Sequence, residues 1–248
     1  MMSSKYRKRL AIVVVMLLLL LGGVLGVTIS YFQDQTDIVK NTFAGGALFN
    51  DPIKNFTIVE QKVMEAPVGS ATKYQLTTGT ATGFAYTVLP GVSIPKRPYI
   101  KVDTLLMDAY LYVVVDTNRF TIATGNDSRT WTSGTGVTWE MASNWKILTD
   151  ASGKAVYKEG KAVYYYVGKN ANGKLPAGTY TEIDIMKQTG SGNGRTSISV
   201  DANYSAESAV EFKIDFKAYI CQISADNTTF TPYQAWKTNF AATAGIGN

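Results

Sequence analysis

The chain has no histidine and a single cysteine, Cys221, among its 248 residues. Without histidine it cannot build a Ser-His or Cys-His nucleophile pair, and the commonest general base and zinc ligand are missing. One cysteine excludes an intrachain disulfide and a CxxC metal or redox motif. Cys221 stands in an apolar run, which predicts a buried strand residue. The composition predicts no catalytic residue, metal site or cofactor, and it favours a protein that is not an enzyme.

Excess charge is also scarce once the N-terminus is set aside. The formal net charge is +5, but Lys5, Arg7, Lys8 and Arg9 lie in the first thirty residues, which contain no acidic residue. Subtracting these four charges from +5 leaves +1 for the rest of the chain. That excess is too small to predict binding to nucleic acid or to an anionic membrane surface.

The one long apolar run lies near the N-terminus. Twelve apolar residues begin at Leu10, directly after the basic residues, and small or polar residues stand at the −3 and −1 positions of a cut between Ser30 and Tyr31. This layout predicts a signal peptide over residues 1–30, cut by a signal peptidase. The alternative is an uncleaved anchor, because the apolar stretch up to Val27 reaches the short edge of a membrane span. Either interpretation predicts export, to the extracellular space or the cell surface.

The rest of the chain is patterned as strands separated by Pro/Gly corners. Ala109–Val115 and Ala162–Val167 are almost wholly apolar and predict central strands. Residues 211–223 alternate between apolar and polar, which predicts a half-buried antiparallel strand. We find no internal repeat and no linker. The pattern therefore predicts an all-β fold, a single antiparallel β-sandwich over residues 51–240, followed by a flexible tail at 241–248.

Residues 121–139 are rich in turn formers and predict a loop, yet they contain Trp131 and Trp139. One interpretation makes these two residues core side chains that cover the end of a sheet. The other makes them a surface platform that contacts a glycan or a protein partner.

Two short segments, residues 30–34 and residues 41–46, form a motif. Ser30–Asp34 places a small residue before an aromatic pair and an aspartate, and Asn41–Gly46 reads Asn-Thr-Phe-Ala-Gly-Gly. Together they resemble the signature of SipW-dependent secreted proteins, the TasA/CalY (camelysin) family of bacterial matrix-fibre subunits. This sequence departs from the family pattern at Ser30 and Tyr31, where alanine or another aromatic residue is more usual. The remainder of the chain resembles the family loosely.

The resemblance implies a secreted structural subunit with a jelly-roll sandwich that polymerises into matrix or pilus-like fibres. Residues 31–50 would be a flexible arm that pairs with an open sheet edge of the next subunit, in head-to-tail donor-strand exchange. The implied partners are other copies of the chain and an anchoring or minor subunit, with no nucleic acid and with membrane contact only through the uncleaved signal. The implied arm residues are Tyr31, Phe32, Asp34, Asn41, Thr42, Phe43, Gly46 and Phe49.

Two other functions remain open from the sequence. A monomeric cell-surface adhesion module would use Trp131 and Trp139. A peptidase is the third, because the family carries a metallopeptidase label through camelysin. The sequence has no HExxH motif and no Asp-rich calcium loop with the usual spacing. Its carboxylates are spread along predicted strands, which is typical of solvated strand faces.

Overall fold

A computed structural model divides the chain into two units, Met1–Tyr31 and Phe32–Asn248. The residues that the structure describes all belong to the second unit, so the predicted signal peptide and the cut before Tyr31 lie outside them. The described residues are 33–37, 41–42, 56–67, 73–81, 88–123, 128–168, 173–204, 212–225 and 228–247. They form mostly strands, and every strand pair is antiparallel, which confirms the all-β prediction.

The largest sheet, here called sheet 1, contains the most apolar strands of the sequence. Its centre is β7 (Ala109–Thr117), paired with β16 (Ile214–Gln222) on one side and β13 (Lys161–Tyr166) on the other. The remaining strands of sheet 1 are β11 (Trp145–Ile147) and β12 (Tyr157–Lys158) beside β13, and β1 (Gln33–Asp37) and β2 (Asn41–Thr42) beyond β16.

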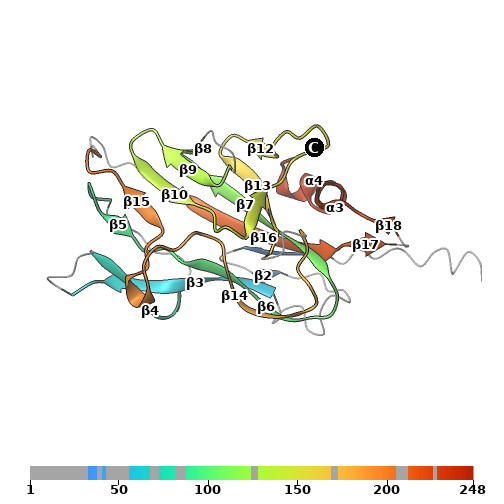
Figure 1. The fold of residues 1–248 in the computed structure, drawn as a ribbon, viewed down its shortest axis with the longest axis horizontal. Coiled ribbons are helices and arrows are strands. Elements are labelled where there is room, and N and C mark those ends of the chain that lie inside the picture. The colour runs from blue at the N-terminus through green and yellow to red at the C-terminus, as the bar shows by residue number, and fades with distance from the viewer. Residues whose placement is uncertain are drawn as a thin grey trace, which may run out of the picture. The chain divides into compact units, whose positions relative to one another are not determined.

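Besides sheet 1 there are two further large sheets, and a two-stranded sheet is described below (Figure 1). Sheet 2 has the order β5 (Ser93–Ile94), β15 (Ile198–Val200), β10 (Val137–Glu140), β9 (Thr130–Ser133) and β8 (Phe120–Ile122). Sheet 3 has the order β14 (Gly178–Asp184), β6 (Pro98–Leu105), β3 (Phe56–Glu65) and β4 (Tyr74–Ala81). A 3-10 turn, η1 (Gly192–Gly194), precedes β15.

Side chains from all three sheets meet in one main core. From sheet 1 it takes alternate residues of β7 and β16, among them Leu111, Val113, Phe216 and Ile220. Sheet 3 and sheet 2 supply the opposing side chains, including Phe56, Ile58, Ile100, Val102, Trp131 and Trp139. Burying one face of each sheet is the usual way in which strands form a stable layered domain.

The other face of sheet 1 is covered as well. After the short hairpin β17 (Ser224–Ala225) and β18 (Thr228–Thr229), the chain forms helices α3 (Pro232–Asn239) and α4 (Ala241–Ala244). These helices build a second core against the remaining residues of β7, β13 and β16, among them Tyr110, Tyr112, Val163, Tyr219 and Cys221. Residues 218–221 of β16 are therefore buried on both faces, whereas the alternation had predicted one buried face. Cys221 is a buried strand residue, as predicted.

The C-terminal segment is packed in its described part, where the sequence suggests a flexible or weakly helical tail at 241–248. Thr231 starts α3 with a capping box, in which its hydroxyl accepts from the amide of Gln234 and the Gln234 side chain accepts in return. Trp236 then packs against β7 and β16, and its indole N–H donates to the carbonyl of Ile246 at 3.3 Å. Ile246 itself is buried. The segment after Phe240 is short and rich in alanine, so its local sequence does not indicate that it packs against sheet 1.

The predicted loop at 121–139 contains three strands instead. β9 and β10 form a hairpin with a turn at Gly134–Gly136, and β8 pairs with β9. Gly136 adopts φ +90°, a conformation that glycine takes readily. The turn formers were identified correctly, but they connect short strands. Among helices of the described residues, none is both long and apolar enough to cross a membrane.

Candidate functional site

Strand β16, which lies between β7 and the predicted arm, makes the longest pairing without a register shift in the described part of the chain. It pairs with β7 through nine consecutive residues, from Ile214 opposite Thr117 to Gln222 opposite Ala109, with no register shift. Phe216 packs edge-on against Trp139 in the main core, with 5.9 Å between ring centres. On the opposite face Tyr219 packs against Trp236 and Phe240, at 5.4 and 5.0 Å. Two cores therefore hold β16 from both faces.

The predicted arm occupies this outer edge. β1 runs antiparallel to β16 with Gln33 opposite Cys221, Thr36 opposite Ala218 and Asp37 opposite Lys217. β2 then pairs with β1, and β1 also contacts β3 of sheet 3. The prediction of a flexible arm is therefore corrected for residues 33–37, which form a strand against their own chain.

Among the predicted arm residues, the structure brings Asp34, Asn41 and Thr42 to this edge. The other arm and cleavage residues lie outside the described ones; they are Ser30, Tyr31, Phe32, Phe43, Gly46 and Phe49. The sequence analysis identified the strand at 211–223 but not its part as the arm's partner. The sequence carried one relevant signal, which is that apolar residues occur on both faces of this strand near Cys221.

The arm strand differs in kind from the strands that it joins. Its sequence, Gln-Asp-Gln-Thr-Asp, contains no apolar residue. Its main attachment to β16 is therefore the backbone ladder, in which each hydrogen bond has a net worth of about 0.5–1.5 kcal/mol. Such a strand can pair with a suitable edge without contributing an apolar core of its own.

The outer strands of the other sheets suit strand addition less well. In the described residues, those of sheet 2 and the far side of sheet 1 are two or three residues long. In sheet 3, β4 has a register shift near Gln61, and β14 has two shifts between Gly178 and Ile183. Bulges and short strands are common protections of sheet edges against unwanted pairing.

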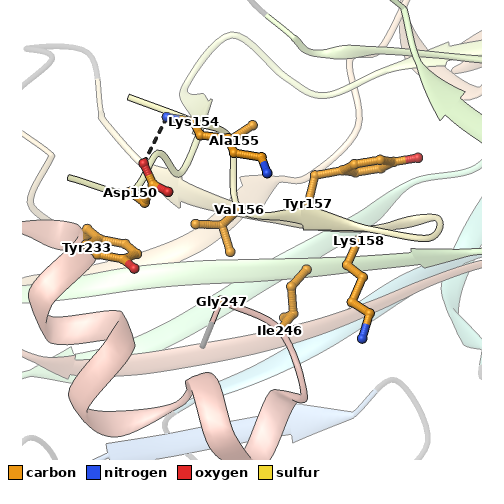
Figure 2. A pocket seen from close by; sticks show the side chains of 9 residues that line it. All are labelled: Asp150, Lys154, Ala155, Val156, Tyr157, Lys158, Tyr233, Ile246 and Gly247. Atoms are coloured by element: carbon orange, nitrogen blue, oxygen red, sulfur yellow. Dashed lines mark hydrogen bonds between the residues drawn. The ribbon is translucent and has the colours of Figure 1, made fainter. Parts of the chain in front are cut away.

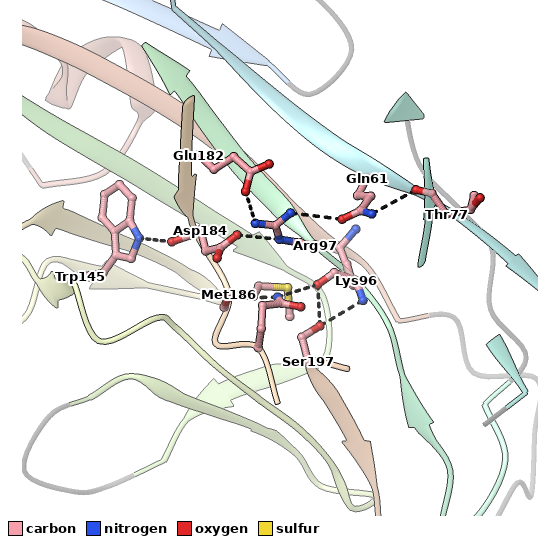
Figure 3. A network of polar contacts seen from close by, with 10 residues as sticks. Gln61, Thr77, Lys96, Arg97, Trp145, Glu182, Asp184, Met186 and Ser197 are labelled. Carbon is pink, nitrogen blue, oxygen red and sulfur yellow. Dashed lines mark hydrogen bonds and ion pairs between the residues drawn. The ribbon is translucent and has the colours of Figure 1, made fainter. Parts of the chain in front are cut away.

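Polar side chains fix these irregular edges in place (Figure 3). Gln61 donates to the carbonyl of Thr77 in the bulged part of β4 at 3.1 Å and accepts from Arg97 at 3.3 Å. Arg97 also binds Glu182 at 2.5 Å and Asp184 at 3.0 Å, both on β14. Burial alone would lower the pKa of Arg97, but the hydrogen bonds and charges of the two carboxylates raise it. The same hydrogen bond from Arg97 lowers the pKa of Glu182.

A second ion pair lies deeper, between β3 and the segment before β6. Lys96 Nζ is 2.8 Å from Glu60 Oε1, and both residues are buried. Ser197 donates its hydroxyl to the carbonyl of Lys96 at 2.7 Å. Buried ion pairs contribute little net stability but are costly to break from one side. These contacts connect sheets 2 and 3 and offer no arrangement of a nucleophile with a base.

Trp131 and Trp139 are core side chains in this structure. Their exposed fractions are 0% and 2%. The rings stack in parallel with 5.4 Å between centres, and the indole N–H of Trp131 donates to the hydroxyl of Tyr164 at 3.0 Å. Buried indoles cannot line a binding surface, so the packing favours the core interpretation over the platform interpretation.

In two pockets of the described surface, the lining carboxylates already have hydrogen-bond or ion-pair partners. One cavity of about 220 Å³ lies between the β11–β12 connection and the C-terminal segment, beside Tyr157, Lys158 and Tyr233 (Figure 2). Its one carboxylate, Asp150, already accepts hydrogen bonds from the amides of Ser152 and Lys154 within its own turn. Another, of about 310 Å³, is lined by paired charges such as Glu140 and Lys187. No group of three or more metal-ligating side chains occurs among the described residues.

Comparison with models of known protein families, with curated proteins and with solved structures finds no match for this chain.

Proposed function

We propose that this protein is a secreted structural subunit that polymerises head to tail into extracellular matrix or pilus-like fibres. Its signal peptide would be residues 1–30, its arm residues 31–50, and its body a jelly-roll-like sandwich. The proposal joins the motif at Ser30–Asp34 and Asn41–Gly46, which resembles the TasA/CalY family, to the geometry of the β16 edge. It assigns the chain no catalytic role and no cofactor.

One observation supports the assembly mechanism above others: β1, which belongs to the arm, is the outer neighbour of β16. In a single chain this pairing is made within the molecule. In a fibre, the arm of one subunit would make the same pairing with β16 of the next. Exchange between identical sites needs no new contact, so the two arrangements differ little in energy and are sorted by concentration.

The chain between arm and body is long enough for this exchange. β2 pairs with β1 and would move with it, so the free span runs from Thr42, which ends β2, to Phe56, which begins β3: fourteen residue steps. At about 3.3–3.6 Å per residue, these steps span at most roughly 50 Å when extended. A neighbouring subunit is within that reach. Because each subunit would give one arm and receive one, the contact does not close and produces a filament.

Before cleavage the signal segment would hold the arm at the membrane. Cleavage by a signal peptidase would therefore release the subunit for assembly, and an anchoring or minor subunit would attach the fibre to the cell. N-terminal sequencing of the secreted protein tests the cut, with Tyr31 as the expected first residue.

The arm itself is tested by comparing a chain that starts at Tyr31 with one that starts at Pro52. Negative-stain electron microscopy and sedimentation should show fibres for the first chain and particles of single subunits for the second. Circular dichroism should show a folded β-rich body in both. Fibres of equal length and yield from the chain that starts at Pro52 would contradict the proposal.

A further inference from the structure

The outer face of sheet 2 carries a row of hydroxyl side chains that crosses all five of its strands. Trp131 on β9 and Trp139 on β10 face the main core, so the alternation of a strand puts Thr132 and Thr138 on the opposite side of the sheet. In the register of the sheet, each hydroxyl residue lies directly opposite the next. From the β8 edge to the β5 edge, the row contains Thr121, Thr132, Thr138, Ser199 and Ser93.

These side chains can be reached from solvent, and they can form hydrogen bonds in both directions. Thr121 and Ser199 are exposed, and the other three are half-buried. Thr132 donates its hydroxyl to a backbone carbonyl at 3.2 Å, so its oxygen remains an acceptor. Within the described part of the chain, the hydroxyls of Ser93, Thr138 and Ser199 donate to no other group. The row therefore offers both donors and acceptors to a ligand.

The row carries no charge, unlike the outer face of sheet 3. There the exposed residues of β6 and β14 include Lys101, Asp103 and Glu182. On sheet 2, the carboxylate of Glu140 lies beyond the row and is already paired with Lys187 at 2.6 Å. A charged ligand would find no counter-charge within the row. A ligand made of hydroxyl groups would find a matching partner at each position, because a hydroxyl both donates and accepts.

The spacing and twist of the row select among such ligands. Neighbouring strands lie about 4.7–4.9 Å apart, so the five positions span roughly 19 Å. The strand spacing is close to the length of one residue in an extended β-linked polysaccharide. Neighbouring strands are also rotated by about 20–25°, so the row turns by roughly 80–100° over its four steps. A single chain can follow this turn, whereas a flat crystal face would contact only part of the row.

We propose that this hydroxyl row binds one chain of an extended, uncharged β-linked polysaccharide, which lies across the strands with one sugar residue near each strand. The hydroxyls of the sugar exchange hydrogen bonds with those of the row. Because each such bond replaces a bond to water, one row binds weakly. In a fibre the row would repeat once in every subunit, and several rows could hold the same chain. Only this gain from repetition rests on the proposed function.

Surface plasmon resonance tests the row without requiring fibres. The full-length chain, in mild detergent, is immobilised through its lysine side chains, none of which belongs to the row. Cellohexaose, an extended β-linked hexamer of glucose, should give saturable binding. Maltohexaose has the same composition but an α-linked, curved chain, and it should bind more weakly. A lack of saturable binding of cellohexaose, or equal binding of the two hexamers, would overturn the proposal.

Variants of the row give the matched controls. Thr132→Val with Thr138→Val removes two hydroxyls and keeps the shape of the side chains, so it should raise the Kd for cellohexaose at least about tenfold. Thr132→Ser with Thr138→Ser keeps the hydroxyls and should still bind. Thr181→Val, on the exposed side of β14, should leave the Kd unchanged.

Near-ultraviolet circular dichroism checks that each variant is folded. An unchanged Kd in the folded double valine variant would overturn the proposal, whether or not the mature protein forms fibres. Sedimentation of the same variants examines the competing occupant, a second copy of the chain. If the double valine variant lost self-association but kept its affinity for cellohexaose, the row would be a contact between subunits and the proposal would be wrong.

Discussion

Strand β16 has two neighbours, β7 and β1, which are attached to it by different interactions. Toward β7 it makes nine consecutive pairs, and the side chains on both strands are buried in two cores. Toward β1 it makes five pairs, and the arm strand has no apolar residue. The first edge is held by packing of side chains, the second mainly by backbone hydrogen bonds. The two sides of β16 are therefore held by different interactions, which is the feature that the proposed exchange of the arm would use.

The predictions below separate these two edges by their energies. Substitutions that disturb the cores around β7 and β16 should lower the free energy of unfolding by several kcal/mol. Substitutions in the arm should change assembly while leaving the body folded.

The largest loss is expected for Trp236→Ala. The indole is fully buried against Tyr112, Tyr219 and Phe240, and removing a buried tryptophan costs about 3–5 kcal/mol. Denaturant unfolding measures this loss. Thr238→Ala, on the exposed side of the same helix, is the control and should change the unfolding free energy by less than about 0.5 kcal/mol. Similar values for both variants would mean that the helices do not stabilise sheet 1.

The same variant should change the chemistry of Cys221. Burial raises the pKa of this thiol well above its usual value, an effect that a hydrogen bond with Tyr112 reduces only in part. A thiolate is needed for reaction, so a thiol reagent at pH 8 should modify the folded protein very slowly. Trp236→Ala should speed the reaction, because it opens the helical cover of β16. Rapid reaction of Cys221 in the folded chain without the substitution would contradict its burial.

Leu111→Ala should cost about 2–5 kcal/mol of unfolding free energy, since Leu111 is fully buried on β7 directly opposite Ile220. Its counterpart across β16 is Thr36→Ala in the arm, which should cost less than about 1 kcal/mol. Chemical denaturation of the two variants compares the edges directly. Equal losses would show that the arm edge is bound as firmly as the β7 edge.

Much of this fold follows from the sequence, and the missing parts have one cause. The apolar runs at β7 and β13 predict these two strands, and the alternation at β16 predicts the third. The order of apolar and polar residues within each segment is enough to indicate which side chains are buried. β8, β9 and β10 escape a sequence-based prediction because each is only three or four residues long and lies among turn-forming residues. Their identity depends on the stacking of Trp131 with Trp139 and on pairing across the sheet, which local composition does not contain.

The candidate site was half predictable for the same reason. The motif around residues 30–46 drew attention to the segment that forms β1 and β2. Local sequence patterns could not identify the strand that pairs with the arm, because β16 lies about 180 residues further along the chain. The helices that cover its outer face were also missed, since Ala241–Ala244 resembles a small-residue tail. Both depend on contacts between distant segments.

Within the arm, Thr36→Pro should weaken pairing without disturbing the body. Thr36 pairs with Ala218 of β16 on one side and with Asn41 of β2 on the other. Its backbone N–H therefore faces a paired strand whichever way it points. Proline removes that donor, with an expected cost of about 1–3 kcal/mol and a tenfold or larger drop in assembly. Sedimentation measures assembled protein. Thr36→Val keeps the donor and should assemble normally; equal assembly of both variants would contradict the backbone account.

The smallest expected effect is on the free energy of unfolding at low pH. The hydrogen bond from Arg97 lowers the pKa of Glu182 in the folded state. The stability from this pair is therefore fully present above the unfolded pKa of about 4.3 and is lost as the pH falls through the lower folded value. Because the Glu182 side chain is 47% exposed, the effect should stay below about 1 kcal/mol. Glu182→Gln should flatten the dependence of unfolding free energy on pH below about 4.3. An unaltered acid profile would mean that the pair contributes nothing.

The most direct test of exchange at the β16 edge uses a disulfide between Asp37→Cys and Lys217→Cys. These positions are directly opposite each other, at a spacing that a disulfide can bridge. Asp37→Cys with Gln222→Cys, five residues further along β16, is the mismatched control and should not cross-link. We predict a bond within single chains in dilute protein, and a ladder of disulfide-linked subunits on a non-reducing gel after assembly. Bonds confined to single chains in assembled material would contradict donor-strand exchange.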